Sequence, residues 1–170
     1  AAAHDAARAA AASRLGQRVF ARLEASPKPV VAAVLGACVG GGCEMVLACH
    51  WRVFADDPST CIGLPEVNHG IIPGFGGTQR LPQVAGLETA LELLTSGEIL
   101  DAKRALQAGL ADELVPPALL VETAQAAALR LARQGHFTSS RGPRHGPLSV
   151  QALRERTTLG RELVLRASEK

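Results

Sequence analysis

The hydrophobic positions of this chain follow two spacings, one typical of helices and one typical of buried strands. Residues 4–25 are rich in alanine and place Leu15, Val19 and Leu23 along one face, which predicts an amphipathic helix. Two prolines follow closely, and we expect the helix to end before them, because proline disfavours helical backbone in the preceding residue. Residues 30–35 are continuously apolar, which is typical of a strand buried on both faces.

The next stretch alternates between short ordered segments and glycine-rich loops. Residues 51–55 predict a second strand, which an Asp-Asp-Pro turn closes. The other segments, in chain order, are a glycine-rich loop over 36–42, a short buried helix over 43–49, an extended segment over 61–66 and a second glycine-rich loop over 70–77. Strands that alternate with helices in this way indicate the α/β fold class.

Helices dominate the chain after the second glycine-rich loop. Apolar residues at helical spacing predict a helix over 87–94, with Gly97 placed as its C-cap. Asp101 is a favourable N-cap for a further short helix. A brief strand at 114–115 then precedes a long helix over 119–132.

The C-terminal part of the chain differs in composition and charge. Residues 134–148 are rich in Gly, Ser, Arg, Pro and His and predict a linker, and 153–168 predict a charged helix. We therefore divide the chain into a globular part over 1–133 and a linker with a basic C-terminal helix over 134–170. This basic tail suits contact with phosphates or an acidic partner, but we favour a solvated helix face with a linker.

The composition excludes several classes of protein. With 170 residues, 47% of them hydrophobic and 20% charged, the chain is that of one globular domain and not a disordered protein. Aromatic residues make up only 3%, so stacking platforms for single-stranded nucleic acid have little to be built from. The longest apolar run is too short to span a bilayer. A net charge of +2 favours no class of partner.

The four cysteines, which are Cys38, Cys43, Cys49 and Cys61, form no C-x-x-C pair. The spacing therefore gives no support to a zinc site, and we expect no metal. Their surroundings are apolar or rich in glycine, which predicts small buried thiols in a reducing compartment. We expect the cytoplasm.

Each glycine-rich loop borders one carboxylate, and these two residues are the candidates for catalysis. Glu44 follows three glycines at the start of a predicted helix, among apolar neighbours that would raise its pKa. Glu66 precedes the second loop. Two carboxylates beside backbone N–H donors can transfer protons next to a carbonyl group. A purely structural role suits them too, with Glu44 near its own helix N-terminus and Glu66 in a surface turn. Neither loop has a nucleotide-binding pattern.

Two long motifs resemble a known family. The stretch KPVVAAVLGACVGGGCE over 28–44 is similar to the enoyl-CoA hydratase/isomerase (crotonase) superfamily, and so are GLPE over 63–66 and GIIPGFGGTQRLP over 70–82. The resemblance covers about residues 10–133 and implies a partial crotonase-like ββα spiral core with C-terminal helices. Residues 48–52 and the long tail look most like the hydratase part of the alpha subunit of bacterial fatty-oxidation complexes.

The resemblance implies a site and a reaction. Gly41 matches one of two backbone N–H donors that polarise the thioester carbonyl of an acyl-CoA, and Gly74 matches a backbone position that orients water. Glu44 and Glu66 match the two carboxylates that activate this water and move the proton at the α-carbon. The implied reaction is hydration of a 2-trans-enoyl-CoA to a 3-hydroxyacyl-CoA in fatty acid β-oxidation, with coenzyme A as part of the substrate and no separate cofactor.

Family members carry a further segment upstream with the first oxyanion donor. This chain begins inside a predicted helix and without methionine, so we expect a fragment. Loss of one oxyanion donor costs about 10²–10³ in rate, which predicts a feeble or inactive chain when isolated. Two alternatives remain, a Δ3-Δ2-enoyl-CoA isomerase and a non-catalytic oligomerisation remnant. A homo-oligomer or a fatty-oxidation complex is the expected assembly.

Four other polar or aromatic residues invite a functional interpretation, and for each we expect a structural role. We expect His69 to face solvent, His50 to be a hydrogen-bonded structural group, Arg80 to cap a loop and Trp51 to lie in the core. Asn68, His69 and Phe75 stand where the family resemblance predicts smaller or more aliphatic residues.

Overall fold

The computed structural model describes residues 2–138, of which it defines the backbone alone at 2–5. The predicted C-terminal helix over 153–168 and most of the predicted linker lie outside these residues. The helices and strands, in chain order, are α1 (Ala2–Glu24), β1 (Val31–Val34), β2 (Ala37–Val39), α2 (Gly41–Leu47), β3 (Trp51–Ala55), β4 (Cys61–Gly63), the 3₁₀ helix η1 (Pro65–His69), α3 (Gly77–Ala85), α4 (Leu87–Ser96), β5 (Ile99–Asp101), α5 (Ala102–Gln107), β6 (Glu113–Val115), the 3₁₀ helix η2 (Pro117–Leu119) and α6 (Leu120–Gln134).

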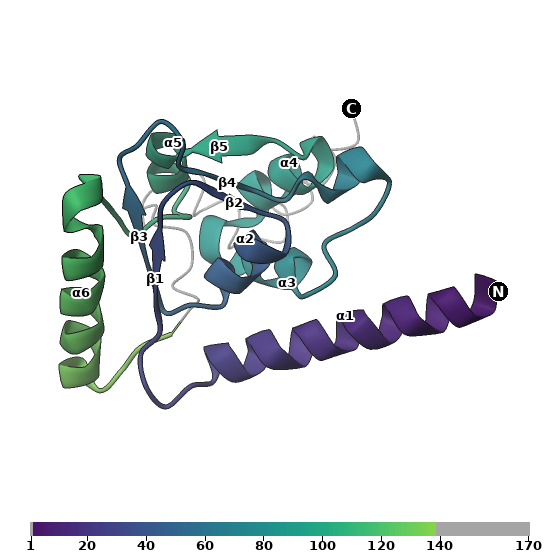
Figure 1. Cartoon of the computed structure of the whole chain (residues 1–170), viewed down its shortest axis with the longest axis horizontal. Helices are drawn as coiled ribbons and strands as arrows, with labels where there is room; N and C mark the ends of the chain where they lie inside the picture. The colour runs from purple at the N-terminus through teal and green to yellow at the C-terminus, as the bar shows by residue number, and fades with distance from the viewer. Residues whose placement is uncertain (1, 139–170) are drawn as a thin grey trace, which may run out of the picture.

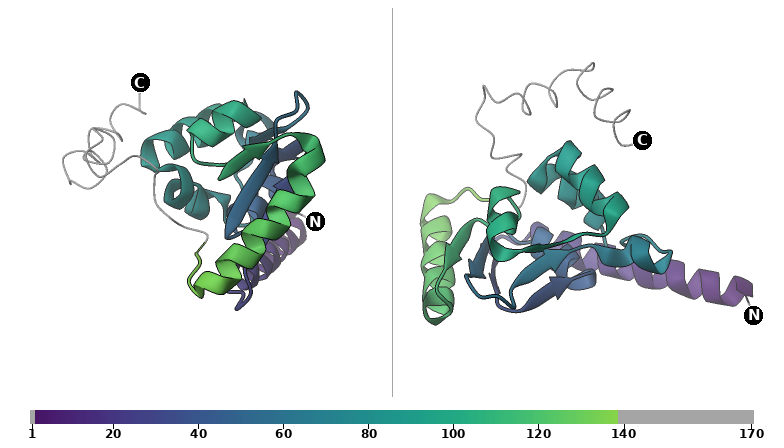
Figure 2. Two further views of the ribbon diagram at one scale, coloured as in Figure 1. Left: turned by 90° about the vertical axis from the view of Figure 1, so that its left-hand side faces the viewer. Right: turned by 90° about the horizontal axis from the view of Figure 1, so that it is seen from above.

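The strands form two small sheets. The first has the order β1-β3-β6 with all strands parallel, and the second has the order β2-β4-β5, in which β5 is antiparallel to β4. Helix α6 packs against β1 and β3 (Figure 1), and Figure 2 shows the same helix lying along the first sheet in a second view. Parallel strands need crossover connections, and here the helices α2 to α5, with η1, and the strands of the second sheet lie between the strands of the first in sequence.

Local signals set several helix ends as predicted. The Oδ1 of Asp101 accepts the backbone N–H of Arg104 at 2.9 Å, so Asp101 caps α5. Gly97 follows α4 with a φ of 67°, a left-handed conformation that favours glycine at this position. Helix α1 ends at Glu24, shortly before the two prolines.

The larger of two hydrophobic clusters lies among α2, the second sheet and α3 to α5, and β1 and β3 of the first sheet contribute Val34 and Phe54 to it. Its members include five side chains that are at most 1% exposed: Leu47, Phe54, Ile62, Leu81 and Leu110. The smaller cluster joins the first sheet to α6 and consists of Val53, Ala55, Leu120 and Ala124. The larger cluster therefore supports the segment that carries Glu44.

Two predictions about strands were wrong. Strand β1 is not buried on both faces, since Ala33 is exposed and Val31 and Ala32 are only partly buried. Residues 36–42 are not a continuous loop, because β2 lies within them. This strand exists through its pairing with β4, more than twenty residues later, and such a partner cannot be read from local composition.

Helix α1 runs along one side of the molecule, and its N-terminal part extends beyond the other elements (Figures 1 and 2). His50, which is 1% exposed, ties its C-terminal end to the first sheet. Its Nδ1 accepts the N–H of Val30 at 2.9 Å, so its Nε2–H donates to the carbonyl of Glu24 at 3.0 Å. The prediction of a hydrogen-bonded structural histidine is confirmed.

Among residues 2–138, no helix is both long enough and apolar enough to cross a membrane.

Candidate active site

Glu44 is buried in the first turn of α2, with 1% of its surface exposed. Its Oε1 accepts two backbone N–H groups, from Phe75 at 2.7 Å and from Gly77 at 2.8 Å. Phe75 belongs to the second glycine-rich loop, and Gly77 begins the helix that follows it, α3. The two glycine-rich segments therefore meet at this carboxylate, more than thirty residues apart in sequence. In the described part of the chain no donor reaches its Oε2.

The surroundings of Glu44 act on its charge in opposite directions. Burial is the largest influence and raises the pKa of Glu44, while the hydrogen bonds from Gly77 and Phe75 lower it. The nearby Glu66 carboxylate raises the pKa further, and the Arg80 guanidinium lowers it. The net effect is a raised pKa, so Glu44 holds its proton more readily than an ordinary glutamate.

Glu66 lies on η1, so it is not in the extended segment predicted for residues 61–66. Its Oε2 is buried and accepts no hydrogen bond from the described residues. Its Oε1 lies so close to Gly40 that a Cβ atom there would be 3.3 Å away. A buried carboxylate oxygen without a donor is costly, so the chemistry of this position calls for a water or substrate group as partner.

The two carboxylates belong to one neighbourhood. Glu66 raises the pKa of Glu44. The pKa of the Cys43 thiol is raised mainly by burial, and both carboxylates raise it further. A neighbouring negative charge disfavours the ionised form of a carboxyl group, and this is how Glu66 raises the pKa of Glu44. Such a pair can supply one general acid and one general base.

Two further backbone N–H groups belong to the glycine-rich segments that meet at Glu44. Gly41 begins α2, and the first N–H groups of a helix have no partner within it. Among the described residues, nothing accepts the N–H of Gly41 or that of Gly74. These two N–H groups are therefore available to an oxygen atom of a ligand. Gly40, which precedes α2, has a φ of 57° that a side chain would disfavour.

Sequence reasoning missed the groups that hold this site together. The N–H groups of Phe75 and Gly77 orient Glu44, and Ser13 and Gln17 of α1 donate to the carbonyl of Gly74. A weak signal was present, since Ser13 and Gln17 are one helical turn apart and so lie on one face of the predicted helix. Nothing in the sequence showed that this face meets the glycine-rich loop.

Arg80 caps the second glycine-rich loop, as predicted. Its Nη1 donates to the carbonyl of Phe75 at 3.1 Å, and its Nε and Nη2 each lie 3.0 Å from Oε2 of Glu24. His69 is exposed, as expected. Trp51 is only partly buried, and its indole N–H donates to Glu113, so its predicted place in the core is only half correct.

Three of the cysteines, Cys38, Cys43 and Cys49, are buried, and Cys61 is partly exposed. Burial raises the pKa of Cys38 and of Cys49 to about 11. These thiols are therefore protonated at neutral pH and are poor nucleophiles. Within residues 2–138, no group of three or more His, Cys, Asp or Glu side chains is arranged to hold a metal ion.

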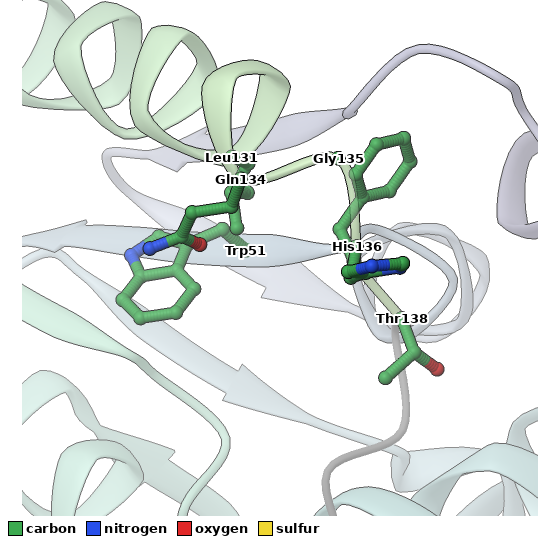
Figure 3. Close-up of a pocket in the computed structure, with 7 residues that line it drawn as sticks. Trp51, Leu131, Gln134, Gly135, His136 and Thr138 are labelled. Carbon is green, nitrogen blue, oxygen red and sulfur yellow. The ribbon is translucent and has the colours of Figure 1, made fainter.

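A cavity of about 640 Å³ lies away from the carboxylates, where α6 ends (Figure 3). Figure 3 shows Trp51 and Gln134 on one side and His136 and Thr138 on the other. Its lining contains no carboxylate and shares no residue with the site around Glu44. The chemistry described above therefore belongs to the glycine-rich loops and not to this cavity.

Comparison with known proteins decides the family of the chain. The family model described as enoyl-CoA hydratase/isomerase matches residues 1–141. The chain belongs to the enoyl-CoA hydratase/isomerase family. The predicted resemblance to this superfamily is thereby confirmed at the level of the family.

Solved structures of the family resemble this chain closely. Enoyl-CoA hydratase from Bacillus anthracis is 40% identical, with a TM-score of 0.67, over 71% of this chain and 46% of that one. DspI from Pseudomonas aeruginosa is 34% identical, with a TM-score of 0.70, over 75% of this chain and 48% of that one. The chain thus spans about half the length of these relatives. Their folds bear out the expected class, a partial crotonase-like α/β core with C-terminal helices.

Proposed function

We propose that the protein hydrates 2-trans-enoyl-CoA thioesters to 3-hydroxyacyl-CoA, with Glu44 and Glu66 as its catalytic acid and base. The observation that carries the proposal is the pair of carboxylate oxygens, Oε2 of Glu44 and buried Oε2 of Glu66, that accept no hydrogen bond from the described residues. Both carboxylates lie beside free backbone donors. A water molecule held between two such oxygens is oriented for attack.

In the proposed reaction one carboxyl group takes a proton from water and the other gives a proton to the substrate. The water oxygen forms a bond to the β-carbon while one carboxylate accepts a water proton. The carboxylic acid of the other residue gives its proton to the α-carbon, where the electron pair of the double bond arrives. Negative charge that develops on the thioester oxygen is stabilised by the N–H of Gly41, and the N–H of Gly74 helps to orient the water.

The test is a crotonoyl-CoA hydration assay, in which the reaction is monitored by the loss of the enoyl-thioester absorbance. It is carried out on this chain and on the longer protein that we expect to carry it. We expect Glu44→Gln and Glu66→Gln each to lower kcat by about 10²–10⁴, the usual contribution of a general acid or base. Glu122→Gln is the matched control, because Glu122 is exposed on α6. Full activity in the double variant Glu44→Gln with Glu66→Gln would overturn the proposal.

Isomerisation of a 3-enoyl-CoA to the 2-enoyl-CoA is the second candidate, since the same carboxylates can move a proton along the acyl chain. Two carboxylates at the site favour hydration, because proton transfer between two carbons needs only one base. A 3-enoyl-CoA assay without added hydratase activity separates the two reactions. If neither reaction occurs in the longer protein and a CoA thioester does not raise the Tm of this chain, a non-catalytic role is supported instead.

The metabolic role, the compartment and the assembly of the protein depend on the same proposal. We infer a role in fatty acid β-oxidation in the cytoplasm, with an acyl-CoA as the only small-molecule partner and no separate cofactor. We also infer a homo-oligomer or a fatty-oxidation complex in which this chain is the hydratase part of an alpha subunit. Exposed apolar side chains support an assembly of this kind, and they include Leu15 and Val19 on α1 and Val121 and Leu129 on α6.

A further inference from the structure

One peptide unit connects helix α1 to Glu44. The carbonyl of Gly74 accepts hydrogen bonds from Ser13 Oγ at 2.5 Å and from Gln17 Nε2 at 2.9 Å. The N–H at the other end of the same peptide plane, that of Phe75, donates to Glu44 Oε1 at 2.7 Å. Gln17 Nε2 also donates to Ser13 Oγ at 3.1 Å, so the two side chains hold each other in place.

Hydrogen bonds at both ends of a peptide plane fix its rotation. The planar unit turns as one body, so fixing the carbonyl direction also fixes the direction of the N–H. Hydrogen bonds to the carbonyl also polarise the unit and strengthen the N–H as a donor. The plane turns about ψ of Gly74 and φ of Phe75, and Gly74 has the permissive backbone of a glycine, so its own chain does little to stop the plane from turning over. The two side chains from α1 are therefore what holds this N–H toward Glu44.

The packing of the Phe75 ring supports the same contact. A Cβ atom on Gly16 would lie 2.2 Å from the ring, so glycine alone lets α1 approach this closely. The ring of Phe20 meets it edge to face at a centroid distance of 5.8 Å. On its other side, a Cβ atom on Gly41 would be 3.4 Å from the Phe75 ring. One face of α1 thus packs against the second glycine-rich loop, next to Gly41. This face consists of Ser13, Gly16, Gln17 and Phe20.

We propose that Ser13 and Gln17 are positioning residues for Glu44 and act through the Gly74–Phe75 peptide. Neither side chain hydrogen-bonds to the carboxylate, and both determine where one of its two donors points. The charged and titratable groups that face Glu44 are Glu66 from η1, Arg80 from α3 and the neighbouring Cys43. The consequence for catalysis rests on the proposed hydratase function, whereas the effect on Glu44 itself does not.

The experiment is an NMR titration of the Glu44 side-chain carboxyl in the full chain, without substrate. We expect Ser13→Ala, Gln17→Ala and the double variant to raise the titration midpoint, by up to about one pH unit in the double variant, because a donor to the charged form is weakened. The amide proton of Phe75 should move upfield in the same variants. Ser13→Thr keeps the hydroxyl group and should restore the midpoint of the wild type.

Two controls separate positioning from a loss of folding. Arg14→Ala and Arg18→Ala change exposed residues of the same helix and should leave the midpoint unchanged. The indole N–H of Trp51, which donates to Glu113 at 2.8 Å far from the loop, reports an intact fold in every variant. An unchanged midpoint in the folded double variant would overturn the proposal, and so would an equal shift in Arg14→Ala.

An activity measurement tests the consequence for catalysis. In the longer protein, Ser13→Ala with Gln17→Ala should lower kcat more than it changes KM and should move the pH profile in the same direction as the midpoint. If the wild type shows no hydration at all, the proposed function fails while the titration still decides the role of Ser13 and Gln17.

Discussion

The backbone of Gly77 lies so close to the side chain of Glu44 that a methyl group on Gly77 would make a tight contact with it. The N–H of Gly77 donates to Oε1 of Glu44 at 2.8 Å, and a Cβ atom on Gly77 would lie 3.0 Å from the Cγ and Oε1 atoms of Glu44. Leu64 Cδ1 lies at the same distance from that Cβ position. Glycine at this position thus permits the contact that orients the carboxylate.

We expect Gly77→Ala to lower the free energy of unfolding by about 1–3 kcal/mol, because the new methyl group overpacks a buried site. Urea denaturation of the full chain measures this difference. Gly42→Ala is the matched control, since its Cβ would make only an ordinary contact at 4.0 Å and alanine favours the helix. Equal stability of Gly77→Ala and the wild type would show that the site can relax around the methyl group.

The raised pKa of Glu44 makes folding depend on pH. Because the pKa lies above the ordinary value of 4.5 in the folded chain, the folded state binds more protons than the unfolded state between these two values. The contribution of this group to stability is therefore complete below the ordinary value and is lost as the pH rises through the folded pKa. Stability is therefore lost as Glu44 is deprotonated, at pH values above 4.5.

We expect Glu44→Gln, which keeps an oxygen for both backbone donors, to remove this loss. The free energy of unfolding of the variant should fall less steeply than that of the wild type when urea denaturation is repeated between about pH 4 and 8. Glu122→Gln on α6 should run parallel to the wild type. Parallel curves for Glu44→Gln and the wild type would mean that Glu44 has the same pKa in both states.

A buried ion pair joins β3 to the segment before β6. Arg52 Nη2 lies 3.0 Å from Asp112 Oδ2, and both side chains are at most 2% exposed. The same carboxylate oxygen accepts the backbone N–H of Arg52 at 2.8 Å. Asp112→Ala would remove a carboxylate that contacts both the buried guanidinium and the backbone of Arg52, and we expect a loss of about 3–5 kcal/mol in the free energy of unfolding.

The surface pair of Lys103 and Asp56 provides the comparison. Its atoms are 3.8 Å apart and its side chains are 71% and 48% exposed. We expect Lys103→Ala to change the free energy of unfolding by less than about 0.5 kcal/mol, because solvent screens the pair. Similar losses for Asp112→Ala and Lys103→Ala would contradict the assignment of the buried pair as the stabilising one.

The cysteines should differ in reactivity. Burial raises the pKa of Cys38 and Cys49 to about 11, so at pH 8 only about one thiol in a thousand is ionised at each position. Cys61 is partly exposed. We expect iodoacetamide to label Cys61 first in the folded chain and all four cysteines at similar rates in urea, as measured by mass spectrometry. Early labelling of Cys38 would show that the core opens readily.

The local features of the chain were readable from its sequence. The prolines after α1, the capping aspartate Asp101 and the left-handed Gly97 act through neighbours within four residues, so their effects appear in the pattern itself. The two glutamates could be named as candidates from the sequence, because each stands beside a glycine-rich segment. By contrast, β2 depends on a partner strand, and the partial exposure of β1 depends on what packs on each face.

The sequence by itself determined which residue types the candidate site contains, namely two carboxylates and the glycine-rich segments beside them. Tertiary structure alone decided how Glu44 is held, because Phe75 and Gly77 reach it across more than thirty residues and Ser13 reaches the same loop across sixty-one. The physical reason is that a helix face or a loop carbonyl has no preferred partner in sequence. It acquires one only when burial brings distant segments together and each buried polar group must find a hydrogen bond.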